Sequence, residues 1–120
     1  MHYLESHEWA RQDGDEIVVG LSPFAANEVG EVIHVELPAV GTQVTRGAAM
    51  AEIESVKSVN DCYAPVTGEV VAVNDELAEH PELVNDDAEG KGWFVRVRPS
   101  DADPLAGLMD AEAYRQHTAG

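Results

Sequence analysis

A period of two in residues 51–55 marks one side of a predicted hairpin. Small or apolar residues alternate there with glutamates, as in a strand that buries one face and exposes the other. Beyond it, residues 62–73 are rich in valine and are punctuated by Pro65 and Gly68, which again favours strand. No glycine or proline lies between the two stretches, so ordinary residues make the reversal. The pattern predicts a hairpin with its tip close to Lys57.

Further strands follow from the same alternation and from the turn residues around it. Asp13-Gly14-Asp15 is typical of a hairpin turn, and Pro38 and Gly41 mark another reversal. The sequence therefore predicts additional strand segments at residues 7–11, 16–21, 31–37, 44–50, 68–73 and 93–98.

Helical segments are predicted from capping residues. A serine or aspartate before a helix accepts bonds from free backbone N–H groups, and proline is favoured at the first helical position. The predicted segments are 24–29 after Ser22-Pro23 and ended by Gly30, 76–84 after Asp75 with an interruption at Pro81, and about 101–117 around Asp103-Pro104. In the last segment Leu105, Leu108, Met109 and Tyr114 can share an apolar face, and residues 85–92 are predicted to form an acidic loop.

A short internal sequence similarity bears on the fold class. Residues 30–35 (GEVIHV) resemble residues 68–73 (GEVVAV), with Lys57 between the copies. Together with the strands this indicates a mainly β, quasi-symmetric sandwich built as one domain over residues 1–120, although two valine-rich strands can also match by chance. The expected core consists of Trp9, Val18, Val32, Val35, Ile53, Val70 and Val95, with Phe94 or Trp93 closing one edge.

Charge excludes one class of partner. The chain has 23 acidic and 7 basic residues, a formal net charge of −16, whereas binding to nucleic acid needs clustered Lys and Arg. No apolar run is long enough for a membrane helix, and the first residues lack the order of a signal peptide. We therefore expect a cytoplasmic monomer. The acidic charge fits either a solubility requirement or a saline habitat.

Lys57 is one of only two lysines, and its predicted place makes it a candidate for covalent chemistry. A single amine at the tip of a hairpin can carry a covalently attached cofactor. The ordinary alternative is a solvated lysine on a turn. Position alone favours the ordinary alternative, and the surrounding residues decide against it.

The stretch ESVKSVNDCYAPVTGEVVAVN at residues 54–74 resembles the lipoyl-lysine region of the glycine cleavage H proteins. The resemblance continues in the same order along nearly the whole chain, through HEW near the start, VELPAVG, PELVN, GW and DAEAY. It implies a lipoyl-domain-like barrel-sandwich hybrid with short helices and a C-terminal helix. It also implies lipoate on Lys57, and a carrier component in place of a catalyst.

The resemblance further implies that the residues around Lys57 are read by an attaching enzyme, a lipoate ligase or lipoyl transferase. The hairpin residues expected to take part in this recognition are Glu54, Ser55, Val56 and Ser58. Lipoate on Lys57 would remove the amine's charge and supply a dithiolane for thiol–disulfide chemistry.

Departures from the family pattern fall outside the lysine motif. Residues 21–27 read LSPFAAN where family members read close to ITDYAQ, and residues 87–93 lack the tyrosine of the usual DPYGEGW. These differences favour the H-like lipoate-binding proteins that work with a heterodisulfide-reductase-like complex in sulfur oxidation. The alternative is glycine cleavage, with glycine decarboxylase, aminomethyltransferase and dihydrolipoamide dehydrogenase as partners. A diverged H protein would show the same departures.

Other candidate sites are weaker. Cys62 is the only cysteine, and we expect it to be buried packing, with redox exchange as the alternative. The pairs His7-Glu8 and His34-Glu36 lack convincing metal-ligand spacing, so exposed polar side chains are expected there. Residues 86–90 resemble a calcium loop only in composition. We therefore predict no metal site and no catalytic residues.

Overall fold

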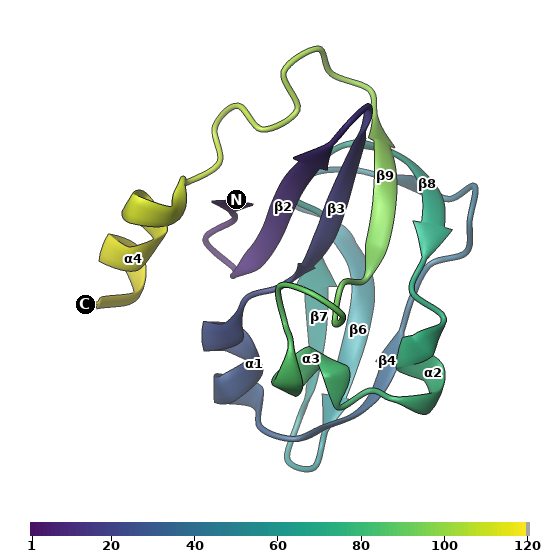
Figure 1. The fold of residues 1–120 in the computed structure, drawn as a ribbon, viewed down its shortest axis with the longest axis vertical. Helices are drawn as coiled ribbons and strands as arrows, with labels where there is room; N and C mark the ends of the chain where they lie inside the picture. Colours follow the sequence, from purple (N-terminus) through teal and green to yellow (C-terminus); the bar gives the residue numbers. More distant parts are fainter. Residues whose placement is uncertain (120) are drawn as a thin grey trace.

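Two antiparallel sheets face each other in the computed structural model, which describes residues 1–119 (Figure 1). The larger sheet has the strand order β1-β2-β3-β9-β8-β5. Its strands are β1 (His2–Tyr3), β2 (Glu8–Asp13), β3 (Glu16–Leu21), β5 (Gln43–Val44), β8 (Gly68–Val73) and β9 (Val95–Pro99). The smaller sheet has the order β4-β6-β7, with β4 (Val32–Glu36), β6 (Ala49–Ser55) and β7 (Val59–Tyr63).

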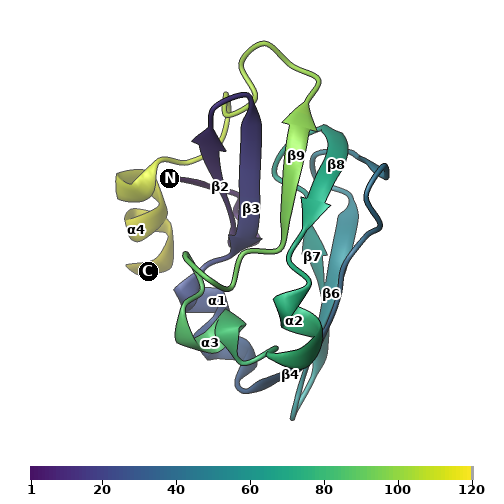
Figure 2. The same ribbon diagram turned by 45° about the vertical axis from the view of Figure 1, so that its right-hand side comes forward.

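The two layers are seen most clearly in Figure 2, where β4, β6 and β7 lie apart from β2, β3 and β9. The two similar sequence segments occupy β4 and β8, one in each sheet, as expected for a sandwich. The mainly β fold class with short helices and a C-terminal helix is confirmed.

Four short helices complete the chain. They are α1 (Pro23–Val29), α2 (Glu76–Glu79), α3 (Leu83–Asp86) and α4 (Ala111–Ala119). The predicted start of α1 is confirmed, because the Ser22 side chain accepts a hydrogen bond from the Ala25 amide. The α1, α2 and α3 helices lie at the same end of the sandwich as the β6–β7 hairpin (Figure 1).

The residues expected in the core are all buried. Trp9, Val18, Val32, Val35, Ile53, Val70 and Val95 are each at most 7% exposed. Trp9 and Val18 belong to a second buried cluster with Tyr3 and Tyr114, whereas the other five lie in the main core. Gly20 is needed opposite Trp9, because a Cβ at that position would lie 2.6 Å from the indole ring. Phe94 is fully buried and Trp93 is half-buried, so Phe94 provides the closing side chain.

Several predicted boundaries were wrong. The segment at 76–84 divides into two one-turn helices, and Asp75 makes no side-chain cap; the amide of Glu76 instead donates to Asn74 Oδ1, at 3.3 Å. Asn85 belongs to α3 and not to a loop. The strand expected from Trp93 begins at Val95, although the Phe94 amide already donates to the Val19 carbonyl of β3 at 2.7 Å.

The C-terminal helix is also shorter than the predicted 101–117. It starts at Ala111, with Asp110 Oδ1 accepting a hydrogen bond from the Ala113 amide at 2.8 Å. The preceding turns are held in another way, since the Arg46 guanidinium donates to the carbonyls of Pro104 and Ala106, each at 2.7 Å. Glycine 120 lies outside the described residues.

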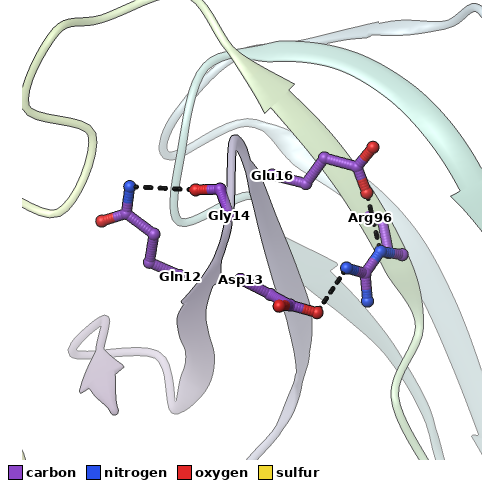
Figure 3. A network of polar contacts seen from close by, with 5 residues as sticks. All are labelled: Gln12, Asp13, Gly14, Glu16 and Arg96. Carbon is purple, nitrogen blue, oxygen red and sulfur yellow. Dashed lines mark hydrogen bonds and ion pairs between the residues drawn. The ribbon is translucent and has the colours of Figure 1, made fainter.

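Polar contacts connect the strands of the larger sheet near the β2–β3 turn (Figure 3). Arg96 of β9 donates to Asp13 at 2.6 Å and to Glu16 at 2.7 Å, on either side of the β2–β3 turn. Ion pairs so open to water contribute little to stability. The contact joins β9 to the first hairpin, at the end of the sheet away from the β6–β7 hairpin (Figure 1).

Candidate functional site

Lys57 lies in the bend between β6 and β7, where the alternation placed the tip of a hairpin. Glu54 and Val59 are the last cross-strand partners before the bend. Lys57 is exposed, and its neighbours Val56 and Val59 are 64% and 59% exposed. Large apolar side chains are therefore left in water on both sides of the only lysine in this hairpin.

The Ser55 side chain builds the bend from inside. Its Oγ accepts hydrogen bonds from the amides of Lys57, at 3.3 Å, and Ser58, at 3.1 Å. The Ser55 amide donates to the Ser58 carbonyl at 2.8 Å. Ser55 is only 5% exposed, so its side chain holds the bend from within, and its part in recognition by an attaching enzyme stays a prediction. Glu54 and Ser58 are half-buried, and Val56 is exposed.

The Lys57 side chain lies against the backbone of Gly30. The φ of Gly30, +83°, favours glycine, and a Cβ there would lie 3.3 Å from Lys57 Cε. The hairpin is also tied to the start of β4, because the Val56 amide donates to the Glu31 carbonyl at 3.1 Å. The aliphatic part of Lys57 is therefore supported, while its amine stays accessible.

Asn85 fixes this support from α3. Its Oδ1 accepts from the Val32 amide at 2.9 Å, and its Nδ2 donates to the carbonyls of Gly30, at 2.9 Å, and Ala26, at 3.3 Å. In the sequence Asn85 is the last residue of the PELVN motif and is predicted to lie in a loop. That motif was the available signal, but nothing local in it specifies partners more than 50 residues away.

A cavity of about 370 Å³ opens beside the inward side of the hairpin. Its lining includes Ile53, Asn60 and Cys62 from the hairpin, Phe24 and Val29 from α1, and Glu8. Asn60 is three residues from Lys57, so their Cα atoms are at most about 11 Å apart. The cavity is within reach of a long group attached to Lys57.

Glu8 is the unexpected residue in this cavity. It was expected to be an exposed polar residue, but it is 1% exposed. Its carboxylate accepts hydrogen bonds from Ser6 Oγ and from the Tyr63 amide, the latter at 2.8 Å. Burial raises the pKa of the Glu8 carboxyl above its ordinary value, although both hydrogen bonds oppose the shift. The HEW motif contained the residue, but only the tertiary structure buries it.

The wall of the cavity at His7 is held by the C-terminal helix. His7 has a φ of +83°, rare for a residue with a side chain, and its Nδ1 lies 2.8 Å from the Tyr114 hydroxyl. The same hydroxyl lies 2.6 Å from Ser22 Oγ at the start of α1. Burial, and then the neighbouring His117, lower the pKa of His7.

The remaining candidate residues carry no separate site. Cys62 is 1% exposed, and burial raises the pKa of its thiol far above the ordinary value, which supports the packing interpretation. Residues 1–119 hold no group of three or more His, Cys, Asp or Glu side chains placed to bind a metal ion. Within the same range, no helix has the length and apolar character needed to cross a membrane.

Comparisons with known proteins match this chain to one family. The family model for the glycine cleavage H-protein matches residues 1–119. A glycine cleavage system H protein from Bradyrhizobium diazoefficiens is 47% identical over 117 residues, covering 98% of this chain and 96% of that protein. A probable glycine cleavage system H protein from Natronomonas pharaonis is 50% identical over 117 residues, covering 98% and 92%.

Structural comparison leads to the same family. The crystal structure of a glycine cleavage system H protein from Mycobacterium marinum superimposes with a TM-score of 0.89 at 31% identity, covering 98% of this chain and 95% of that one. These relatives support glycine cleavage better than the sulfur-oxidation interpretation that we drew from the departures at residues 21–27 and 87–93. Proteins of this family are lipoyl carriers and not catalysts. On the full-length family match, the close relatives and the shared fold, the chain belongs to the glycine cleavage H-protein family.

Proposed function

We propose that this chain is lipoylated on Lys57 and carries the aminomethyl group from glycine decarboxylase to aminomethyltransferase, with dihydrolipoamide dehydrogenase as the third partner. The observation that carries the proposal is the exposed Lys57 at the hairpin tip, with its side chain lying over Gly30. The family match supports the choice of partners.

The residues around Lys57 fit a lipoyl group. The amine is exposed, as an attaching enzyme requires, and the glycine beneath it leaves space that a Cβ would fill. Lipoate joined to the amine as an amide supplies a dithiolane, whose sulfurs accept electrons and a transferred group. Ser55, Gly30 and Asn85 hold the backbone so that the attachment point stays in one orientation.

The cavity beside the hairpin gives the loaded arm a place to dock. Ile53, Leu21 and Cys62 supply apolar lining, and Glu8 adds a carboxylate to the wall. A buried carboxylate attracts a cationic amine more strongly than an exposed one, because the local dielectric is low. We assign to Glu8 the role of holding the amine of the transferred group while the arm is shielded from water.

Modification of Lys57 is tested by intact mass spectrometry after co-expression with a lipoate ligase. The wild-type chain and Lys91→Arg should each gain one lipoyl group, because Lys91 lies far along the sequence on a different loop. Lys57→Arg should gain none, since arginine keeps the charge but cannot form the amide. A lipoyl group on Lys57→Arg, or none on the wild type, would contradict the proposal.

The pathway is tested by giving the lipoylated chain to glycine decarboxylase with glycine and pyridoxal phosphate. The expected product is the aminomethylated arm, detected by mass. An authentic H protein at equal concentration is the reference, because the chemistry of the arm allows slow loading by a non-cognate carrier. Loading at a comparable rate supports glycine cleavage, and a rate lower by orders of magnitude counts against it.

A further inference from the structure

The outer face of the smaller sheet carries a row of like charges. Glu36 of β4 is the cross-strand partner of Glu52 of β6, and Glu52 is the partner of Asp61 of β7. All three side chains are exposed. Directly opposite residues have Cβ atoms about 5 Å apart, and like charges there are destabilising. We refer to Glu36, Glu52 and Asp61 as the acidic row.

The described chain does not neutralise this row. Within residues 1–119 the ion pairs involve His80, Arg96, Arg98 and Arg115, and none of them reaches the acidic row. Proteins keep locally unfavourable arrangements mostly where function requires them. The row is therefore suited to positive charge supplied by another molecule.

A shallow depression lies between two members of the row. It has a volume of about 300 Å³ and is lined by Glu36 and Glu52 together with Leu37, Pro38 and Met50. Met50 is buried, at 8% exposed, whereas Leu37 and Pro38 are half-buried, so these two residues provide the apolar surface beside the two carboxylates. Lys and Arg side chains lay their aliphatic stems along apolar surface and keep their charge at its rim. The depression has the chemistry to receive such a side chain.

The same face leads to the attachment lysine. Glu52 of β6 precedes Lys57 by five residues, so their Cα atoms are at most about 17 Å apart. Exposed Ile33, Val56 and Val59 add apolar contact area toward the tip. Lipoylation would remove the Lys57 ammonium and make this end of the sheet more negative. A cationic surface should therefore bind the lipoylated form better than the unmodified one.

We propose that this sheet face docks the enzyme that loads the lipoyl arm, and that an Arg or Lys side chain of that enzyme enters the depression between Glu36 and Glu52. The proposal rests on the proposed function for its choice of enzyme. The partner's contact surface is basic, with an apolar zone facing Val56 and Val59.

The test compares lipoylated wild-type chain with the double variant Glu36→Gln/Glu52→Gln as substrates of glycine decarboxylase. Each substitution keeps the size of the side chain and removes one charge. We expect KM for the carrier to rise about 3- to 10-fold with kcat unchanged, since exposed charge pairs are each worth a fraction of a kcal/mol. The wild-type KM should rise steeply with NaCl and that of the double variant less so.

Asp101→Asn/Asp103→Asn is the matched control. It also removes two negative charges, but from an exposed turn that lies outside the proposed docking surface. Its KM should equal that of the wild type. An equal KM for the wild type and the Glu36/Glu52 variant would overturn the docking surface. An equal rise of KM in the control would overturn it too, because net charge alone would then explain the effect.

A second measurement does not depend on the pathway. Titration with a short arginine-containing peptide should shift the NMR amide signals of residues 36–38 and 49–52, and these shifts should vanish in the Glu36→Gln/Glu52→Gln variant. Absence of these shifts in the wild type would overturn the depression as a cation site. Peptide shifts without any loading by glycine decarboxylase would reject the proposed pathway and leave the cation site standing.

Discussion

Asn85 and Gly30 are joined by a hydrogen bond of 2.9 Å, although 55 residues separate them in the chain. The bond links helix α3 to Gly30 at the end of α1, against which the Lys57 side chain lies. The Asn85 side chain also accepts from the Val32 amide. One asparagine therefore fixes the backbone beneath the attachment lysine, and nothing in the neighbouring sequence indicates this contact.

Asn85→Ala should destabilise the fold and slow lipoylation. The substitution leaves the Val32 amide and the Gly30 carbonyl without their partner, a cost of about 1–3 kcal/mol. Denaturant unfolding and the initial rate of lipoylation measure the two effects. Asn27→Ala is the control, because Asn27 is an exposed asparagine on nearby α1. Equal behaviour of the two variants would show that the Asn85 bonds contribute nothing.

Gly30→Ala should separate backbone strain from contact with the lysine. Both Gly30 and Gly14 have positive φ, so alanine at either position should reduce stability, by about 1–2 kcal/mol at Gly14. The cost should be larger at Gly30, because its ψ of −159° places it in a region of backbone space that essentially only glycine adopts. Only at Gly30 does the new Cβ meet Lys57, whereas nothing lies within 4 Å at Gly14. We therefore expect lipoylation to slow in Gly30→Ala and to keep its rate in Gly14→Ala. Equal lipoylation rates would show that Lys57 does not depend on this support.

Ile53→Ala should destabilise the chain by about 2–5 kcal/mol, because it leaves a cavity between the sheets. Ile53 is 1% exposed. Ile33→Ala is the matched control on the adjacent strand of the same sheet, where the side chain is 46% exposed, and a change within about 0.5 kcal/mol is expected. Thermal unfolding distinguishes the two, and similar shifts in Tm would contradict the assigned sheet faces.

Glu8 should make stability fall as pH rises. Its pKa is raised by burial, so between the ordinary carboxyl pKa and the raised value the folded chain binds more protons than the unfolded chain. The free energy of unfolding therefore decreases with rising pH through that window, and the loss is complete above the raised pKa. Glu8→Gln keeps the acceptor for the Tyr63 amide and removes the charge.

The measurement is the free energy of unfolding of both chains from about pH 4 upward. Stability of Glu8→Gln relative to the wild type should increase with pH and then level off. Ser6→Ala, which removes one donor to the carboxylate, should raise the Glu8 pKa further and move the window to higher pH. A difference between wild type and Glu8→Gln that stays constant with pH would contradict the raised pKa.

The sequence by itself determined the features that depend on neighbouring residues. Alternation in residues 51–55 set which side chains of β6 face the core, and Ser22 with Pro23 set the start of α1. The motif around Lys57 determined the family. These features are local, because a strand's period and a helix cap each involve residues only a few positions apart.

The tertiary structure decided what depends on contacts between distant segments. The burial of Glu8 requires β7 to lie against β2, and the Asn85 bonds require α3 to pack beside the start of β4. The turns before the C-terminal helix are held by Arg46, which donates to the carbonyls of Pro104 and Ala106. Each partner is chosen by packing across more than 50 residues, and no periodicity or capping pattern along the chain encodes that choice.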